Sequence, residues 1–394
     1  MRCFLCHQDN ITEFLNLGQQ PLANKYPANE AEFKTEDFFQ LAVFFCPQCK
    51  NTQLGTIVPR EKMFRDYYYL SSVNLGLVRH FEQLAKRIAK AHFVVDIGSN
   101  DGILLKPLKE LGVKALGVDP SINVSKIAND AGLPTIVSFF DLATAEAIKA
   151  QYGRPDTVVA SSIFTHVEDP HQFVEDVKTL MTDDGVFIIE VEYIGNILQN
   201  VQFERFYLDR IFYYSLTSLK HVSEAHGMHI TDVEKIELHG GSIRVTVCKQ
   251  GRGSAPSERV HAFLEEEEKQ LTLSKLEDFK RRVDSSIAAF RDKLQEYKKL
   301  RVKVAGYGAP ARVTTICNYG KIGASLIEFI VDDSSLKQNR FSPGTHIPIV
   351  PQSYLKGHKP DVLVVFAYEY FNDIKKKING DYRYLIPIPP REVR

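Results

Sequence analysis

Short apolar runs separated by amphipathic stretches dominate the chain from residue 93 to residue 250. Phe93–Ile97 has the length and composition of a buried strand, and a glycine-rich turn follows from Gly98 to Gly102. An amphipathic stretch then leads to a second apolar run that ends at Asp119. Further strands are expected in DTVVASS, GVFIIEVEY and HITDVEKIELHGGSIRVTVCK, the last as two strands joined by a His-Gly-Gly turn. This alternation predicts an α/β domain with a doubly wound sheet.

Helical periodicity appears on both sides of that domain. Residues 61–92 read as helical, with apolar residues at helical spacing (Leu77, Phe81, Leu84 and Ile88). A polar linker, GRGSAPSER, precedes a long amphipathic stretch up to residue 300, in which we expect the run EEEE to form a solvated helix face. From Arg301 a strand, a glycine turn and a helix recur, which predicts a second α/β unit.

The length of 394 residues suits two or three domains. We expect a zinc-binding lobe at 1–60, a cofactor-binding domain at 61–250, a linker with a helical segment at 251–300, and a C-terminal α/β domain at 301–394. Hydrophobic residues make up 44% and charged residues 25%, and Lys+Arg and Asp+Glu both count 49. This balance argues against a nucleic-acid partner. The chain shows no apolar run of membrane-spanning length and no secretion signal, so we expect a cytoplasmic monomer.

Two Cys-x-x-Cys motifs lie in the first fifty residues. In a cytoplasmic chain this pattern favours a metal over disulfides, and two such knuckles complete a tetrahedral four-thiolate site. The predicted ligands of a structural zinc ion are Cys3, Cys6, Cys46 and Cys49. Cys248 and Cys317 stand alone in apolar surroundings and are expected to be core thiols.

The turn DIGSNDG lacks the spacing of the dinucleotide fingerprint GxGxxG. It resembles motif I of class I S-adenosylmethionine (SAM) methyltransferases, in which an acid opens the loop. On that resemblance Gly98 and Gly102 face the methionine half of SAM, and Asp119 binds the ribose hydroxyls. The alternative interpretation, a Rossmann-like domain that binds another ligand or none, is not excluded by this turn alone. The predicted cofactor-binding residues are Tyr67, Ser71, Asp96, Gly98, Asn100, Gly102, Asp119, Pro120 and Ser162.

Four features in this order carry a more specific resemblance: the paired CxxC knuckles, DIGSNDG, LHGGSIRV, and GYGAPA…NYG followed by VDDSSLKQNRFSPGTHIPI. Together they resemble the C-methyltransferases of nucleotide-linked deoxy-ketosugars. The resemblance implies a Rossmann-like class I methyltransferase domain between a zinc-ribbon-like N-terminal lobe and a second, C-terminal α/β domain. It implies SAM as cofactor and a sugar nucleotide, a dTDP-linked 4-keto-6-deoxyhexose, as substrate. A base removes the proton at C3, and the enolate takes the methyl group.

The resemblance also assigns residues position by position. Tyr67, Tyr69, Ser71, Ser72 and His80 correspond to a segment that helps to close over SAM, and His166 to a histidine in the loop after the fourth strand. The substrate-binding residues it implies are Tyr69, His80, Gly240, Gly241, Arg244, Tyr307, Ala311, Lys337, Asn339 and Arg340. His239 lies beside two glycines that let a ligand approach closely.

The family's motif FDxxYxEHxFxFS aligns with FERFYLDRIFYYS, which places Tyr207, Asp209 and Arg210 around the reacting carbon. The favoured base of the family is the histidine of that motif, and here the position is Arg210, which cannot act as a general base at neutral pH. The family also tends to have Asn where this chain has Ser162. Three hypotheses follow: Tyr207, His166 or His239 takes the proton while Arg210 stabilises the enolate; another carbon, oxygen or nitrogen is methylated; or the protein only binds its ligands.

Two further classes remain as alternatives at the level of sequence. One is a nicotinamide-dependent oxidoreductase that uses either glycine turn. The other is a zinc-stabilised sugar-nucleotide binding protein without catalysis. The candidate catalytic residues under the favoured hypothesis are Tyr207, Asp209, Arg210, His166 and His239.

Overall fold

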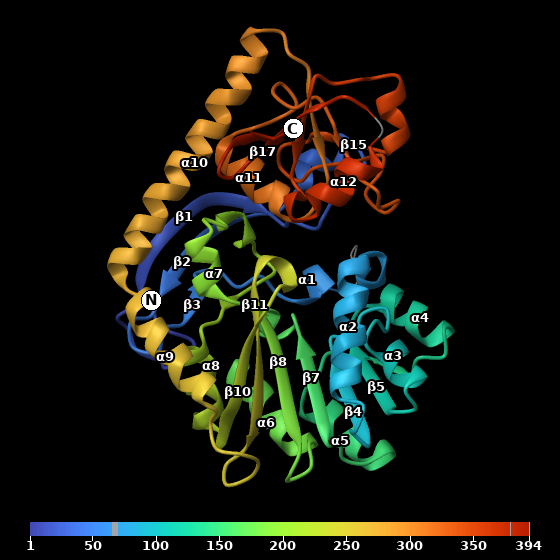
Figure 1. Cartoon of the computed structure of the whole chain (residues 1–394), viewed down its shortest axis with the longest axis vertical. Helices are drawn as coiled ribbons and strands as arrows, with labels where there is room; N and C mark the ends of the chain where they lie inside the picture. The colour runs from blue at the N-terminus through green and yellow to red at the C-terminus, as the bar shows by residue number, and fades with distance from the viewer. Residues whose placement is uncertain (65–69, 379, 394) are drawn as a thin grey trace.

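The computed structural model describes residues 1–64, 70–378 and 380–393. Tyr67 and Tyr69 therefore lie outside the described residues. Three β-sheets organise the chain, and Figure 1 shows the central sheet with its helices below, the C-terminal unit above, and the N-terminal sheet curving between them. This is the α/β architecture that the sequence predicted.

The N-terminal sheet is antiparallel and has the order β1-β2-β3-β9. Its strands are β1 (Thr12–Pro21), β2 (Phe38–Phe45), β3 (Thr52–Leu54) and β9 (Phe212–Tyr213). The last strand comes from the crowded aromatic segment, far along the chain, and pairs Tyr213 with Thr52. The zinc-binding lobe thus completes its sheet with a piece of the segment that carries Arg210.

The central sheet has the order β10-β11-β8-β7-β4-β5-β6, with β11 antiparallel to both of its neighbours and the remaining pairs parallel. Its strands are β4 (Phe93–Ile97), β5 (Lys114–Asp119), β6 (Thr135–Val137), β7 (Thr157–Ser161), β8 (Val186–Glu192), β10 (Met228–Ile236) and β11 (Ser242–Lys249). β4 is buried along its whole length, because helices cover both faces of such a sheet. The predicted strand-loop-helix-strand start is confirmed.

Helices flank this sheet, and polar residues begin several of them. Asn74 accepts hydrogen bonds from two backbone amides of α2, Asp141 caps α5, and Ser215 forms a capping box on α8. The helices are α1 (Glu61–Phe64), α2 (Leu75–Arg87), α3 (Leu105–Glu110), α4 (Ile122–Asp130), α5 (Leu142–Tyr152), α6 (Pro170–Leu180), α7 (Ile194–Gln199) and α8 (Leu216–Ala225).

Two helices, α9 (Glu258–Gln270) and α10 (Leu273–Lys299), connect the central sheet to the C-terminal unit, and α10 runs along one side of the molecule (Figure 1). The expectation of a fully solvated EEEE face is wrong for Glu267, which is buried. Its carboxylate accepts hydrogen bonds from the backbone amides of Leu216 and Thr217, because the first turn of α8 has amides without intrahelical partners.

The C-terminal sheet has the order β14-β15-β13-β12-β16-β17-β18, with a parallel centre and antiparallel edges. Its strands are β12 (Val304–Tyr307), β13 (Ile330–Val331), β14 (Arg340–Phe341), β15 (Pro348–Val350), β16 (Val362–Val365), β17 (Arg383–Ile386) and β18 (Arg391–Val393), with helices α11 (Arg312–Gly320) and α12 (Phe371–Lys377). Tyr26 of the N-terminal lobe donates a hydrogen bond to the Ala309 carbonyl at 2.8 Å, which holds the lobe against this unit. No helix in the described ranges is long and apolar enough to cross a membrane.

Candidate active site

A cavity of about 320 Å³ extends from the glycine turn after β4 to the loop before α11. It lies at the carboxyl ends of the parallel strands, the edge at which such sheets bind ligands. Residues of the N-terminal lobe, the central domain and the C-terminal unit all contribute to its walls. The predicted residues that line it are Ser71, Asp96, Gly98, Asn100, Asp119, Pro120, Ser162, His166, Tyr207, Arg210, His239, Ala311 and Lys337.

Asp119, at the end of β5, is oriented at one end of the cavity by backbone amides. Its carboxylate accepts hydrogen bonds from Asn100 N at 2.9 Å and from Ser121 N at 2.8 Å. Burial raises the pKa of Asp119, and these amides act against that rise. No cation of the described residues forms an ion pair with the carboxylate, so it remains available to the hydroxyl donors of a ribose.

The glycine turn requires glycine at its first position for a steric reason. Gly98 has φ of +79°, and a Cβ at this position would lie 2.9 Å from Cβ of Ile163. The turn is covered by the segment before α2, because Ser71 N donates to Asn100 Oδ1 at 3.0 Å and Ser72 Oγ donates to Asp101. When SAM is bound, Asp119 and the turn are the residues that would hold it.

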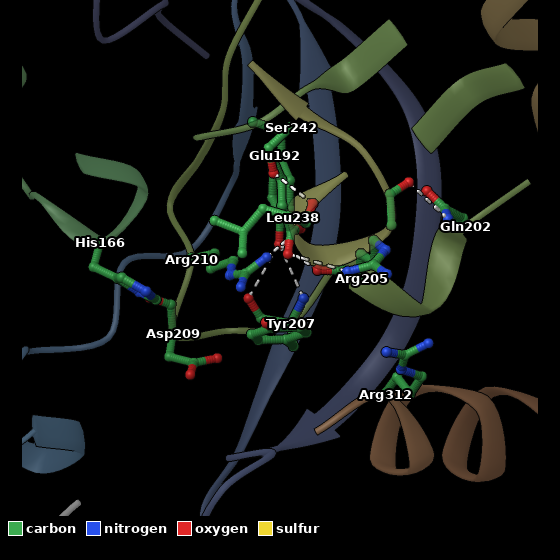
Figure 2. Close-up of polar contacts among 12 residues, drawn as sticks. His166, Glu192, Gln202, Arg205, Tyr207, Asp209, Arg210, Leu238, Ser242 and Arg312 are labelled. Carbon is green, nitrogen blue, oxygen red and sulfur yellow. Dashed lines mark hydrogen bonds and ion pairs between the residues drawn. The ribbon is translucent and has the colours of Figure 1, made fainter. Parts of the chain in front are cut away.

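An alternating chain of buried charges forms one wall of the cavity, and Figure 2 shows Glu192, Arg205, Arg210 and Arg312 of this chain. Glu192, at the end of β8, is ion-paired with Arg210 and accepts a hydrogen bond from Arg205 at 3.1 Å. Arg205 also pairs with Glu369 of the C-terminal unit, and Glu369 in turn accepts from Arg312 at 2.8 Å. The charge chain (Arg210, Glu192, Arg205, Glu369 and Arg312) therefore crosses from the central domain to the C-terminal unit.

The guanidinium groups set the ionisation of this wall. Burial acts to raise the pKa of Glu192, but Arg210 and Arg205 outweigh it and hold that pKa at about 2. The pKa of Glu369 is likewise lowered, because Arg312 and Arg205 overcome the effect of burial. Both carboxylates are therefore ionised at neutral pH and are poor proton acceptors.

The aromatic segment places Tyr207 beside Arg210, whose guanidinium carbon lies 4.8 Å from the centre of the tyrosine ring. Burial raises the pKa of Tyr207 well above its ordinary value, so the phenol keeps its proton. Asp209 does not line the cavity: in Figure 2 its carboxylate points away from Arg210, and it accepts a hydrogen bond from Asn24 at 3.0 Å. Burial raises the pKa of Asp209 to about 6.

Two histidines face the cavity. His166 donates a hydrogen bond from Nδ1 to the backbone carbonyl of Asp209, which leaves Nε2 as the acceptor nitrogen of the neutral ring. His239 lies at the tip between β10 and β11 with φ of +47°. Burial, together with the charge of Arg210, lowers the pKa of both rings to about 4. Both imidazoles are therefore neutral at neutral pH.

Other predicted residues lie outside the cavity. His80 and Arg244, proposed to contact substrate, instead bind the buried carboxylate of Glu190, with His80 Nε2 at 2.9 Å and Arg244 Nε at 2.6 Å. Burying Glu190 requires such partners, which explains both side chains without a ligand. The remaining predicted residues that do not line the cavity are Gly102, Gly240, Gly241, Tyr307, Asn339 and Arg340.

The two glycines beside His239 serve the protein rather than a ligand. A Cβ at Gly240 would collide with Arg205 and Glu369, and one at Gly241 with Asn196. The idea that these glycines let a ligand approach is therefore corrected, since side chains of the protein fill that space. Their positive φ values, +74° and +119°, also favour glycine.

In the C-terminal unit, Lys337 donates to the Ala309 carbonyl at 3.0 Å and lines the cavity with Ala311. Tyr307 instead bonds Asp333 at 3.2 Å, and Arg340 bonds the Tyr26 carbonyl at 3.1 Å. Lys337 is thus the predicted basic residue of this unit that reaches the cavity.

The four predicted zinc ligands converge in the N-terminal lobe. The Sγ atoms of Cys3, Cys6, Cys46 and Cys49 lie within 4.8 Å of one another, with Cys3 and Cys49 3.6 Å apart. Zinc–thiolate bonds of about 2.3 Å in a tetrahedron place the sulfurs about 3.8 Å apart, so the arrangement fits zinc. The residue after each knuckle, His7 or Lys50, has a positive φ of +59° or +55°.

Several cavity residues were not predicted from the sequence, namely Asn24, Arg60, Asn74, Glu192, Arg205, Arg312, Glu369 and Tyr370. For Glu192 the available signal was a charged residue at the end of an otherwise apolar strand. Glu369 and Arg312 had no comparable signal, because their partners are distant in sequence.

Comparison with known proteins agrees with this architecture. Residues 3–64 match the family "Putative zinc binding domain", residues 68–233 match "Methyltransferase domain", and residues 237–389 match "C-methyltransferase C-terminal domain". The C-methyltransferase NovU of Streptomyces niveus is 30% identical over 403 residues, which cover 99% of this chain and 96% of the relative. The chain belongs to this C-methyltransferase family. As a member, it is a SAM-dependent methyltransferase with a zinc-binding domain, and the nicotinamide alternative is dropped.

Other similarities cover less than half of this C-methyltransferase. A ubiquinone biosynthesis O-methyltransferase of Azorhizobium caulinodans is 30% identical over 142 residues, 33% of this chain and 54% of the relative. Among solved structures, magnesium protoporphyrin IX methyltransferase from Synechocystis PCC 6803 with bound SAM is 16% identical, covering 45% of this chain and 82% of that chain with a TM-score of 0.34. Mitomycin 7-O-methyltransferase is 14% identical, covering 44% and 53%, with a TM-score of 0.35.

Proposed function

We propose that this C-methyltransferase methylates a nucleotide-activated 4-keto-6-deoxy sugar at C3, with a dTDP-linked sugar as the first substrate to test. The observation that carries the proposal is one continuous cavity with Asp119 at its SAM end and a cluster of basic groups at its other end. The central domain supplies the first end, and the C-terminal unit contributes Arg312 and Lys337 to the second. A nucleoside diphosphate sugar is long enough to need both.

The charges at the second end support a diphosphate. Arg205, Arg210, Arg312 and Lys337 line the cavity together with the carboxylates of Glu192 and Glu369. The buried carboxylates of Glu204 and Asp332 also interact with Arg312 and Lys337, so acids of the protein offset much of this positive charge. Arginine and lysine suit phosphate oxygens, and these side chains are the donors that a diphosphate would use.

Arg210 and Tyr207 supply the donors that an enolate requires. Deprotonation next to a ketone moves negative charge to the carbonyl oxygen, and fixed donors in a buried site stabilise that charge. Arg210 stays charged because Glu192 outweighs the effect of burial on its pKa, and Tyr207 keeps its phenolic proton. Bound SAM would supply the electrophilic methyl group.

The direct test is incubation of the zinc-loaded protein with SAM and a panel of nucleotide-linked 4-keto-6-deoxy sugars, with NMR of the product. The expected product carries a new methyl group at C3, and one equivalent of S-adenosylhomocysteine (SAH) forms. Matched 4-hydroxy sugars serve as controls, because without the ketone the C3 proton is not acidic. A methyl group on oxygen or nitrogen would instead establish the other acceptor. Binding of SAM and sugar nucleotide without transfer would establish the non-catalytic alternative.

A further inference from the structure

We infer that His239 is the proton acceptor of this enzyme. The inference rests on the proposed function, since it concerns removal of the proton next to the ketone. It is drawn from the surroundings of each titratable side chain that faces the cavity.

The acidic and basic groups of the charge chain are unsuitable as bases. Arg210 stays protonated and is locked in its ion pair with Glu192. Glu192 and Glu369 each contact two guanidinium groups, and a carboxylate held in this way resists protonation.

The aromatic segment offers no better acceptor. Tyr207 retains its proton, so it serves as a donor. Asp209 lies outside the cavity, and Asn24 occupies one of its carboxylate oxygens. Asp96 and Asp119, the two aspartates of the lining, interact with each other beside the glycine turn, where SAM would bind. The imidazoles of His166 and His239 remain among the described cavity residues.

His239 differs from His166 in its bonds and in its charged neighbours. His166 is anchored through Nδ1 to the Asp209 carbonyl, whereas no hydrogen bond to another described residue engages the His239 ring. Burial, Arg210 and Arg205 lower the pKa of His239, and two carboxylates, Glu192 and Glu369, act against that effect. For His166, Glu192 is the carboxylate that acts in this way.

The backbone around His239 supports a functional role. His239, Gly240 and Gly241 are three consecutive residues with positive φ, and His239 is the residue for which this conformation is unfavourable. Such strain persists where the surroundings impose it, often at functional sites. Here the Arg205–Glu369 pair packs against Gly240 and fixes the tip that presents the imidazole.

The proposed step is balanced within the site. A neutral imidazole nitrogen of His239 forms a bond to the C3 proton, and the electrons of the C–H bond form the enolate, whose oxygen is stabilised by Arg210. C3 of the enolate would then form a bond to the methyl group of bound SAM as the methyl–sulfur bond breaks, and SAH would leave as the neutral thioether. His239 afterwards returns its proton to solvent.

The test measures proton exchange without methyl transfer. The zinc-loaded protein is incubated in D₂O with SAH and the nucleotide ketosugar accepted by the wild type, and loss of the C3 proton signal is followed by NMR. His239→Asn is the main variant, because asparagine tolerates a left-handed conformation. His239→Gln is the second variant, His166→Asn tests the competing base, and His261→Asn, on the exposed side of α9, is the control. Calorimetric titration with SAH establishes that each variant is folded.

We expect exchange at least 100-fold slower in His239→Asn and His239→Gln, as for loss of a general base, with SAH affinity kept and with His261→Asn equal to the wild type. Exchange retained in both His239 variants, or lost in His166→Asn alone, overturns the inference. If the wild type neither exchanges the C3 proton of any ketosugar in the panel nor methylates any of them, the proposed function is overturned, and the inference falls with it.

Discussion

Asn24, in the zinc-binding lobe, donates a hydrogen bond from Nδ2 to Oδ2 of Asp209, at a distance of 3.0 Å. The neighbouring Arg210 belongs to the charge chain, and Phe212 and Tyr213 form the last strand of the N-terminal sheet. The lobe therefore contacts residues 209–213 by side chain and by backbone. We expect a zinc ion bound in the lobe to support this wall of the cavity.

Removal of zinc should consequently abolish methyl transfer. Without the metal the four thiolates lose their common ligand, and the support that the lobe gives to residues 209–213 is weakened with it. We expect Cys49→Ser to bind less than one zinc ion per chain and to lose at least tenfold in activity, measured by metal analysis and SAM turnover. Cys248→Ala is the matched control, because Cys248 lies on β11 away from the zinc ligands, and it should retain one zinc ion.

Asp119 should contribute directly to cofactor affinity. A carboxylate that binds two ribose hydroxyls forms charge-assisted hydrogen bonds worth roughly 1.5–3 kcal/mol each. Asp119→Ala should weaken SAH binding about 100-fold or more in calorimetric titration. Asp130→Asn, at an exposed pair with Lys126, should bind as the wild type does. Equal affinity in Asp119→Ala would remove Asp119 from the cofactor site.

The ionisation of Glu192 should make the free energy of unfolding depend on pH. Its pKa is depressed from an ordinary 4.5 to about 2, so the ionised pair contributes stability above pH 4.5 that is lost as the pH falls through 2. The shift corresponds to roughly 3 kcal/mol. Glu192→Gln should be less stable at pH 7 by about 3–5 kcal/mol, because two buried guanidinium groups lose a partner. It should also lose less stability than the wild type between pH 4.5 and pH 2.

Urea unfolding at a series of pH values measures both predicted effects of Glu192→Gln, the lower stability at pH 7 and the smaller loss of stability in acid. Glu265→Gln, on the exposed face of α9, is the control and should follow the wild type at every pH. Parallel pH profiles for Glu192→Gln and the wild type would show that the charge chain does not depress this pKa.

Gly240 and Gly227 offer a matched pair for the packing of the hairpin tip. Both have positive φ, +74° and +64°, so alanine strains the backbone by about 1–2 kcal/mol at either position. At Gly227 nothing lies within 4 Å of the added Cβ, whereas at Gly240 it meets Arg205 and Glu369. We therefore expect Gly240→Ala to be the less stable of the two in thermal unfolding and to lose activity, while Gly227→Ala keeps it. Equal destabilisation would mean that the ion pair moves aside at no cost.

The pKa that sets the acid limb of the pH–rate profile should be unusually low. Burial lowers the pKa of His239 to about 4, so the ring stays neutral at pH 5.5, where an ordinary imidazole with a pKa of about 6.5 is mostly protonated. We expect kcat/KM for the nucleotide ketosugar to fall less than twofold between pH 7.5 and pH 5.5. A tenfold fall over that range, with the protein still folded, would contradict an acceptor with this pKa.

Local features of the chain were predictable because neighbours in sequence create them. The strand ending at Ile97, the turn at Gly98 and the acid at Asp119 form one βαβ unit, and each CxxC knuckle is a single tight turn. The charge chain could not be predicted in the same way. Arg205 and Glu369 are 164 residues apart, and either residue alone resembles an ordinary surface charge.

The same limit explains the corrected expectations. Glu267 has the pattern of a solvated helix, yet it is buried because the first turn of α8, from another part of the chain, needs an acceptor. His80 and Arg244 were assigned to the substrate because they match a motif. Their partner Glu190 lies within an apolar strand, and nothing in the local sequence pairs it with either residue.

The strand borrowed by the N-terminal sheet constrains how members of this family can be recombined. Residues 212–213 complete a sheet that begins with Thr12, so the N-terminal lobe is not a removable module. A chimera that exchanged only the first sixty residues for those of a relative would join two unmatched strand edges beside Arg210. Recombination at this junction therefore has to exchange residues 203–215 together with the lobe. A chimera made in this way would take its acceptor preference from the same parent as its metal-binding lobe.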